Sequence, residues 1–108
     1  MRRARILVHG EAAGILEELE RNGKCRFFYL EGYSGPPASL TLPVVAEPYK
    51  FEGFPAFLDG LLPEGVQLEA LLRQRKIDAH DYFGQLVAVG ADLVGAVTVE
   101  PLPEEPAA

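Results

Sequence analysis

Cysteine and histidine are scarce in this 108-residue sequence, and tryptophan is absent. With a single cysteine, Cys25, an internal disulfide is impossible, which fits a reducing compartment such as the cytosol. The sequence also lacks a run of about 18 apolar residues, the length that a membrane-spanning helix needs. The apolar run after the basic start MRRAR is short, and Glu11 closes it, which argues against a signal peptide. We therefore expect a cytoplasmic protein without membrane contact.

Basic residues are also fewer than acidic ones. Sixteen Asp and Glu residues outnumber ten Lys and Arg residues, so the formal net charge is −6. Binding to nucleic acid relies on clustered basic side chains that neutralise phosphates, and here the basic residues are scattered. We therefore expect no direct contact with DNA or RNA.

Motifs that carry chemistry are missing too. His9 and His80 are far apart and form no HxxxH or HExxH spacing, and the glycines do not form a phosphate-binding loop. Cys25 lacks a base at a recognisable spacing, so we expect a buried structural thiol. The glutamates within residues 17–20 are expected to be solvated. The sequence thus predicts no catalytic residue, no cofactor and no metal.

The first half of the sequence reads as strands. The dipeptide Asn22-Gly23 favours a tight hairpin, and it argues for a strand before it rather than the rival helix over residues 11–21. A turn is expected at residues 10–14. Extended segments are predicted over residues 5–9, 15–19, 25–30 and 39–42, with one edge strand near Val44 or Tyr49.

The second half reads as helices followed by a strand. Apolar residues at positions 54, 57, 58, 61 and 62 share one face of a short helix that Pro63 ends. A second helix is expected from about Glu64, with Leu68, Leu71 and Leu72 on its inner face. A third helix over residues 79–89, capped by Asp78, and a strand over 93–99 complete the pattern. Close approach of a neighbour would explain the small residues Gly95 and Ala96 in that strand.

These elements predict one α+β domain: a small, twisted, mainly antiparallel sheet or partly closed barrel covered by two to three helices. The domain is expected to span residues 1–101, and residues 102–108 form an acidic, proline-rich tail.

The turn between the first two helices is the candidate partner-binding site. Proline and glycine fix the shape of this turn, and an exposed apolar side chain beside polar neighbours would suit an anchor for a partner. The alternative is that its apolar side chains pack inward. The candidate residues are Leu62, Pro63, Glu64, Gly65, Val66 and Gln67.

Four segments together resemble a known family. SLTLP at residues 39–43, FPAFLDGLLPE at 54–64, DYF at 81–83 and GADLVGAV at 90–97 occur in the order found in the N-terminal subdomain of HipA-type toxin kinases. The resemblance extends over residues 5–101. It implies the fold of that subdomain, whereas the Gly-rich loop and the catalytic and metal-binding Asp residues of the kinase core have no counterpart here.

A free-standing subdomain of this kind is similar to the HipS-like antitoxins of three-component HipBST toxin–antitoxin systems. The resemblance implies a non-enzymatic cytoplasmic antitoxin that binds and neutralises a HipT-like Ser/Thr kinase. It also implies a HipB-like helix-turn-helix protein as a partner within the complex. The alternative is a structural subdomain that completes a HipA-like kinase and mediates contact with a HipB-like repressor. A fragment of a longer kinase is a further alternative, although the start MRRARILV and the acidic end favour a complete chain.

Overall fold

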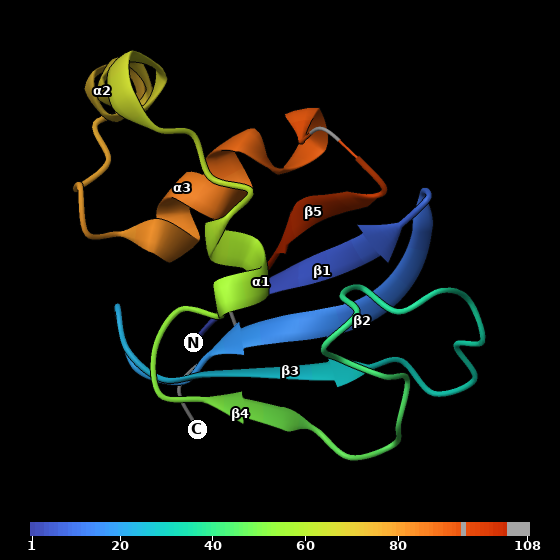
Figure 1. The fold of residues 1–108 in the computed structure, drawn as a ribbon. Coiled ribbons are helices and arrows are strands. Elements are labelled where there is room, and N and C mark those ends of the chain that lie inside the picture. The colour runs from blue at the N-terminus through green and yellow to red at the C-terminus, as the bar shows by residue number, and fades with distance from the viewer. Residues whose placement is uncertain (94, 104–108) are drawn as a thin grey trace.

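A computed structural model describes residues 1–93 and 95–103. Its main feature is a five-stranded antiparallel sheet with the order β4-β3-β2-β1-β5 (Figure 1). The sheet is open, with β4 and β5 at its edges, so the antiparallel sheet is confirmed and the barrel alternative is not. The strands are β1 (Arg2–Val8), β2 (Glu11–Glu18), β3 (Cys25–Tyr29), β4 (Tyr49–Phe51) and β5 (Val97–Leu102).

The tight hairpin joins β1 to β2, whereas the sequence predicted it at Asn22-Gly23, between the second and third strands. His9 and Gly10 join β1 to β2 with φ angles of 50° and 78°, and Val8 pairs with Glu11. Two positive φ angles are what a type I′ turn requires. Asn22 also has a positive φ, but it lies in a longer loop that the Leu19 N–H to Lys24 C=O hydrogen bond closes. The second strand therefore begins at Glu11 rather than at residue 15, and the rival helix is ruled out.

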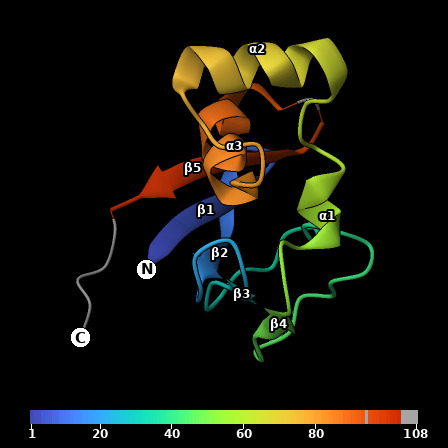
Figure 2. The same ribbon diagram turned by 90° about the vertical axis from the view of Figure 1, so that its left-hand side faces the viewer.

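Within the described residues, three helices accompany the sheet: α1 (Ala56–Asp59), α2 (Gly65–Arg75) and α3 (Tyr82–Val89), the last continued by a 3₁₀ turn, η1 (Gly90–Asp92). Helices α1 and α3 lie over one face of the sheet, and α2 lies beyond α3, away from the strands (Figure 2). The predicted α+β fold, with a sheet covered by two to three helices, is thus confirmed for the described residues.

Several predicted boundaries are wrong. Helix α1 is a single turn, because the chain leaves the helix at Gly60 rather than at Pro63. Residues 39–42 form a turn, closed by a Leu42 N–H to Ser39 C=O bond, instead of an extended segment. Helix α3 starts at Tyr82 because Asp81, and not Asp78, accepts the hydrogen bond from the Gly84 N–H.

The last strand starts later than predicted, at Val97. Gly95 lies before it with φ of +112°, so backbone freedom, rather than close packing, explains that glycine. Close packing occurs at Gly90 instead, where an added Cβ would lie 2.2 Å from the Val99 carbonyl oxygen. Strand β5 continues to Leu102, which pairs with Arg3, while residues 104–108 of the expected tail lie outside the described residues.

The core lies between the sheet and the helices α1 and α3. Alternate residues of β1 and β3 point into it, as the period of a half-buried strand dictates. The largest fully buried side chains come from both layers: Ile6, Leu16, Phe27, Pro55, Leu58, Gln85, Leu86 and Val99.

Candidate partner-binding surface

The predicted turn at residues 62–67 connects α1 to α2 and has a defined backbone. After α1, the Leu62 N–H donates to the Asp59 carbonyl oxygen at 3.2 Å. Glu64 is extended and precedes α2, and its carbonyl oxygen accepts from the Leu68 N–H at 3.4 Å. Gly65 has φ of +60°, a region that glycine occupies without strain. Pro63 therefore fixes its own φ angle, and Gly65 permits the left-handed conformation that the turn adopts.

The six candidate residues differ in exposure. Leu62 is half-buried, as the inward-packing alternative requires, and Pro63 is half-buried as well, whereas Glu64, Gly65 and Gln67 are exposed. Val66 is 80% exposed, so the inward-packing alternative is wrong for this side chain. An isolated exposed Val is ordinary, but this one stands at the start of a helix, beside a groove with apolar walls.

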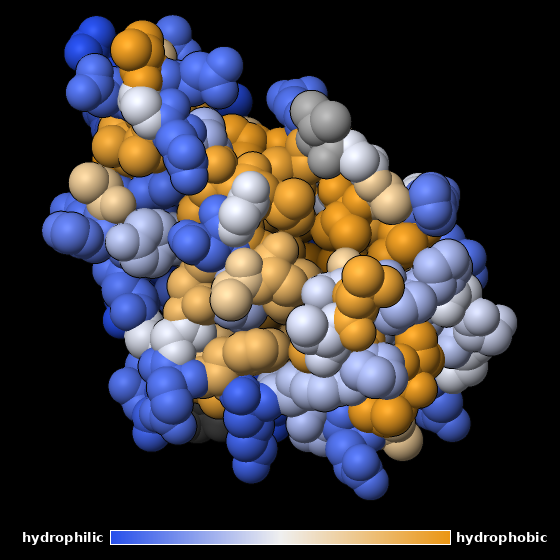
Figure 3. Space-filling view, in the orientation of Figure 1, coloured by the Kyte–Doolittle hydropathy of each residue, from blue (hydrophilic) through white to orange (hydrophobic). Residues whose placement is uncertain are grey.

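This groove, which we call the α1–α3 groove, has a volume of about 570 Å³. Figure 3 shows continuous apolar surface between α2 and the end of α3. The residues that line the groove are Gly60, Leu61, Leu62, Pro63, Glu64, Gln67, Val89, Asp92 and Leu93. The prediction from sequence included four of these nine residues and missed the wall formed by α3 and η1. The motif GADLVGAV, which supplies two of the missed residues, is the signal that could have found that wall.

Helix α2 is held loosely. None of its residues, all of which are described, is buried, and Leu68, Leu71 and Leu72 are only half-buried. Its C-terminal cap, Lys76, is left-handed with φ of 55°. The helix is confirmed, but its inner face rests against α3 rather than entering the core.

The glutamates within residues 17–20 behave differently from the prediction. Glu17 and Glu18 are each only 5% exposed, and Glu20 alone is exposed. Each buried carboxylate has an arginine partner: Glu17 accepts from Arg26, and Glu18 accepts two hydrogen bonds of 2.6 Å from Arg2. Alternation along β2 could not reveal this, because burial of a carboxylate depends on a partner from another strand.

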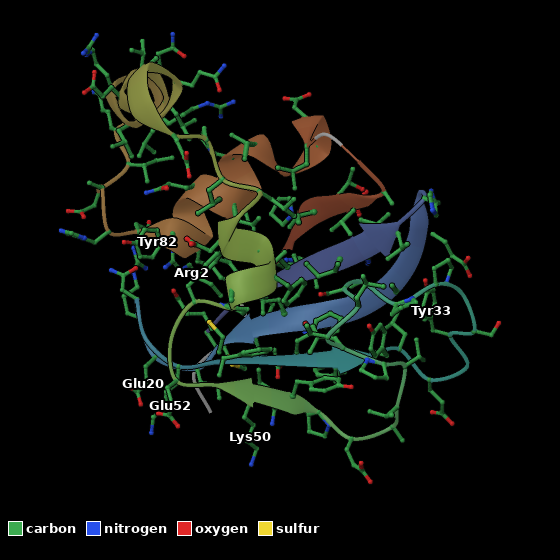
Figure 4. The ribbon with its side chains drawn as sticks, viewed as in Figure 1. Arg2, Glu20, Tyr33, Lys50, Glu52 and Tyr82 are labelled. Carbon is green, nitrogen blue, oxygen red and sulfur yellow. The ribbon has the colours of Figure 1, made fainter. Side chains whose placement is uncertain are left out.

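Arg2 connects three elements and is structural. Its guanidinium also donates to Asp81 at 2.9 and 3.2 Å and lies 5.0 Å from the centre of the Phe83 ring. Figure 4 shows Arg2 at the start of β1, beside the N-terminal end of α3, where Tyr82 lies. Burial acts to raise the pKa of Asp81, but the hydrogen bonds from Arg2 and from the Gly84 N–H outweigh it and lower that pKa.

The residues considered for chemistry do not form a reactive site. Burial, followed by the charge of Glu18, raises the pKa of the Cys25 thiol to about 11, so the thiolate nucleophile is disfavoured. The expected burial of Cys25 is confirmed, since it is 2% exposed. His9 and His80 are exposed, and the described residues include no group of three or more candidate metal ligands. Within the part of the chain that is described, no helix is long and apolar enough to cross a bilayer.

A second apolar surface lies in the loop between β3 and β4, which the sequence analysis did not single out. Leu40 is 98% exposed there, and Val44 and Val45 line a hollow of about 470 Å³ together with Tyr29 and Tyr33. The sequence predicted short extended segments within this loop, but they are too short to show a periodicity from which the exposure of these side chains could be deduced.

Comparison with known proteins finds similarity over nearly the whole chain. Residues 4–100 match the family described as HipA N-terminal domain. An uncharacterized protein from Haemophilus influenzae is 29% identical over 100 residues, which cover 93% of this chain and 92% of that protein. A solved structure titled N-terminal domain of HipA toxin has the same fold, with a TM-score of 0.73 and 24% identity, over 97% of this chain and 96% of that chain.

Proposed function

The chain belongs to the HipA N-terminal domain family, and from this premise we propose that it is a HipS-like antitoxin. In this role it is non-enzymatic and binds and neutralises a HipT-like Ser/Thr kinase. It acts in the cytoplasm, within a HipBST toxin–antitoxin system that also contains a HipB-like DNA-binding protein. The observation that carries the proposal is the exposed Val66 on a shape-restricted turn beside the α1–α3 groove.

The physical argument concerns the entropy of docking. A turn whose backbone is already restricted loses little freedom when it binds, so its side chains contribute more to net affinity. Val66 is apolar and lies between Gly65 and the polar Gln67, an arrangement that suits a small anchor with a polar rim. The match covers 92% of the Haemophilus influenzae relative, so that protein consists of little beyond a domain of this kind.

Co-expression with a HipT-like kinase tests the proposal. We expect the chain to restore growth that the kinase suppresses, to co-purify with the kinase, and to lower its autophosphorylation. Co-purification without any drop in autophosphorylation would contradict the antitoxin role.

The second candidate is a structural subdomain that completes a HipA-like kinase and mediates contact with a HipB-like repressor. The match in fold to the N-terminal domain of HipA toxin favours it. The two candidates predict opposite effects on the kinase. A completing subdomain raises the stability or activity of the kinase, whereas an antitoxin lowers its activity. Kinase assays with and without added chain therefore separate them.

We further expect the purified chain alone to bind neither ATP nor duplex DNA. The sequence has no phosphate-binding loop, and its net charge of −6 opposes contact with phosphates. Isothermal calorimetry with Mg-ATP and a gel shift at physiological salt check both points. Saturable nucleotide binding at micromolar concentration, or a salt-sensitive shift, would contradict the expectation.

A further inference from the structure

The α1–α3 groove combines apolar walls with an acidic rim. Four of its side chains, Leu61, Leu62, Val89 and Leu93, are half-buried and apolar. Glu64 and Asp92 lie on the same groove and are exposed, and the described residues that line it include no Lys or Arg. The groove therefore offers contact for an apolar side chain within reach of two uncompensated carboxylates.

We propose that this groove receives an apolar side chain of the kinase partner that is flanked in sequence by Lys or Arg. The inference rests on the proposed function for the source of that segment. Charge complementarity selects its chemistry: two carboxylates beside an apolar floor attract a flanking cation and repel an acidic or phosphorylated segment. An uncharged apolar segment would contact the apolar floor but would form no ion pair with the two carboxylates of the rim.

The α3 side of the groove is preorganised by packing against the sheet. Gly90 brings the start of η1 so close to β5 that an added Cβ would lie 2.2 Å from the Val99 carbonyl oxygen. Asp92 and Leu93 follow directly on this anchored segment. A wall that is already fixed in the free protein loses little entropy when a partner binds, and this favours binding at the groove.

A peptide experiment tests the chemistry of the groove without the kinase. The probes are acetyl-Arg-Leu-Leu-Arg-amide and acetyl-Glu-Leu-Leu-Glu-amide, titrated into the full chain carrying ¹³C-labelled Leu and Val methyl groups. We expect the Arg peptide to shift the methyl signals of Leu61, Leu62, Val89 and Leu93, and to bind at least ten-fold more tightly than the Glu peptide. Equal affinities, or no saturable shift at millimolar peptide, overturn the proposal.

Charge reversal tests the same contact with the kinase. The double variant Glu64→Arg/Asp92→Arg should weaken binding to the co-expressed kinase at least ten-fold, with a melting temperature close to that of the original chain. Glu64 accepts no side-chain hydrogen bond from the backbone N–H groups at the start of α2, so its replacement removes no capping bond and costs only the weak interaction of its charge with the helix dipole. Glu52→Arg, also exposed but at the end of β4 (Figure 4), is the matched control and should bind normally.

The outcomes separate this inference from the proposed function. If Val66→Asp weakens kinase binding but the double charge reversal does not, the proposed function stands and the groove proposal is overturned. If the unmodified chain does not bind the kinase while the Arg peptide binds selectively, the groove chemistry is supported and the kinase is overturned as its source. If kinase binding is unchanged in both variants, the groove proposal is overturned.

Discussion

The antiparallel sheet and helix α2 bury their side chains to very different extents. In β3, Cys25, Phe27 and Tyr29 are buried at alternate positions, whereas none of the residues of α2, all of them described, is buried. The two regions also differ in polar contacts: the sheet carries the paired network around Arg2, and the α1–α2 turn leaves Glu64 and Gln67 exposed. The difference separates the part of the chain that supplies most of the stability from the exposed part that we propose as the partner-binding surface.

The largest expected effect is in the core. Phe27 is fully buried and contacts the rings of Tyr29 and Phe57, so Phe27→Ala should lower the free energy of unfolding by about 3–5 kcal/mol. Val66→Ala, in the exposed region, should change it by less than about 0.5 kcal/mol. Urea unfolding of both variants measures the contrast. Equal losses would show that α2 supports the fold as strongly as the sheet does.

The second-largest expected loss of stability concerns the ion pairs of β1, where Arg can be replaced by Met at two positions. Arg2→Met leaves the buried carboxylate of Glu18 and the partly buried carboxylate of Asp81 without their cation and should destabilise the fold by about 3 kcal/mol. Arg5→Met removes the pair with Glu100, in which both side chains are exposed, and should cost less than about 1 kcal/mol. Thermal unfolding of the two variants checks this order. A larger loss from Arg5→Met would contradict the structural role of Arg2.

The pH dependence of stability follows from the same network. The pKa of Asp81 is lower in the folded state than in the unfolded state, so its contribution is present above the unfolded value of about 3.9. That contribution is lost as pH falls through the lowered folded value. We expect Asp81→Asn to lose less free energy of unfolding than the original chain between pH 5 and pH 2, measured by urea unfolding. An identical acid-induced loss in both proteins would contradict the assignment to Asp81.

Sequence patterns predicted most of the sheet because a half-buried strand repeats every two residues, and Cys25, Phe27 and Tyr29 display that period. They misplaced the cap of α3, because Asp78 and Asp81 are both capable caps and only packing against Arg2 distinguishes them. They also missed the burial of Glu17 and Glu18, since the partners Arg26 and Arg2 come from neighbouring strands. Such pairing depends on strand register, which spacing within one segment does not encode.

For the candidate site, the sequence predicted the restricted turn but not the groove beside it. Pro63 and Gly65 are local signals, and their effect on the backbone follows from their own chemistry. The opposite wall requires Val89, Asp92 and Leu93 to lie beside the turn, and that depends on how α3 packs on β5. The exposure of Val66 likewise became clear only from the position of α2 beyond α3.

A substitution at Val66 is expected to change stability the least and yet to weaken binding. Val66→Asp should weaken binding to the kinase by more than about 1 kcal/mol, because a carboxylate replaces the apolar anchor. It should leave the melting temperature nearly unchanged, because Val66 is 80% exposed and lies in the first turn of α2, where the helix dipole favours a negative charge. Leu40→Asp, at the 98% exposed position of the other apolar loop, is the matched control and should bind normally. Calorimetric titration and thermal unfolding of the two variants provide both readouts. Unchanged affinity of Val66→Asp would remove the turn from the interface, and a selective loss in Leu40→Asp would move the interface to the loop between β3 and β4.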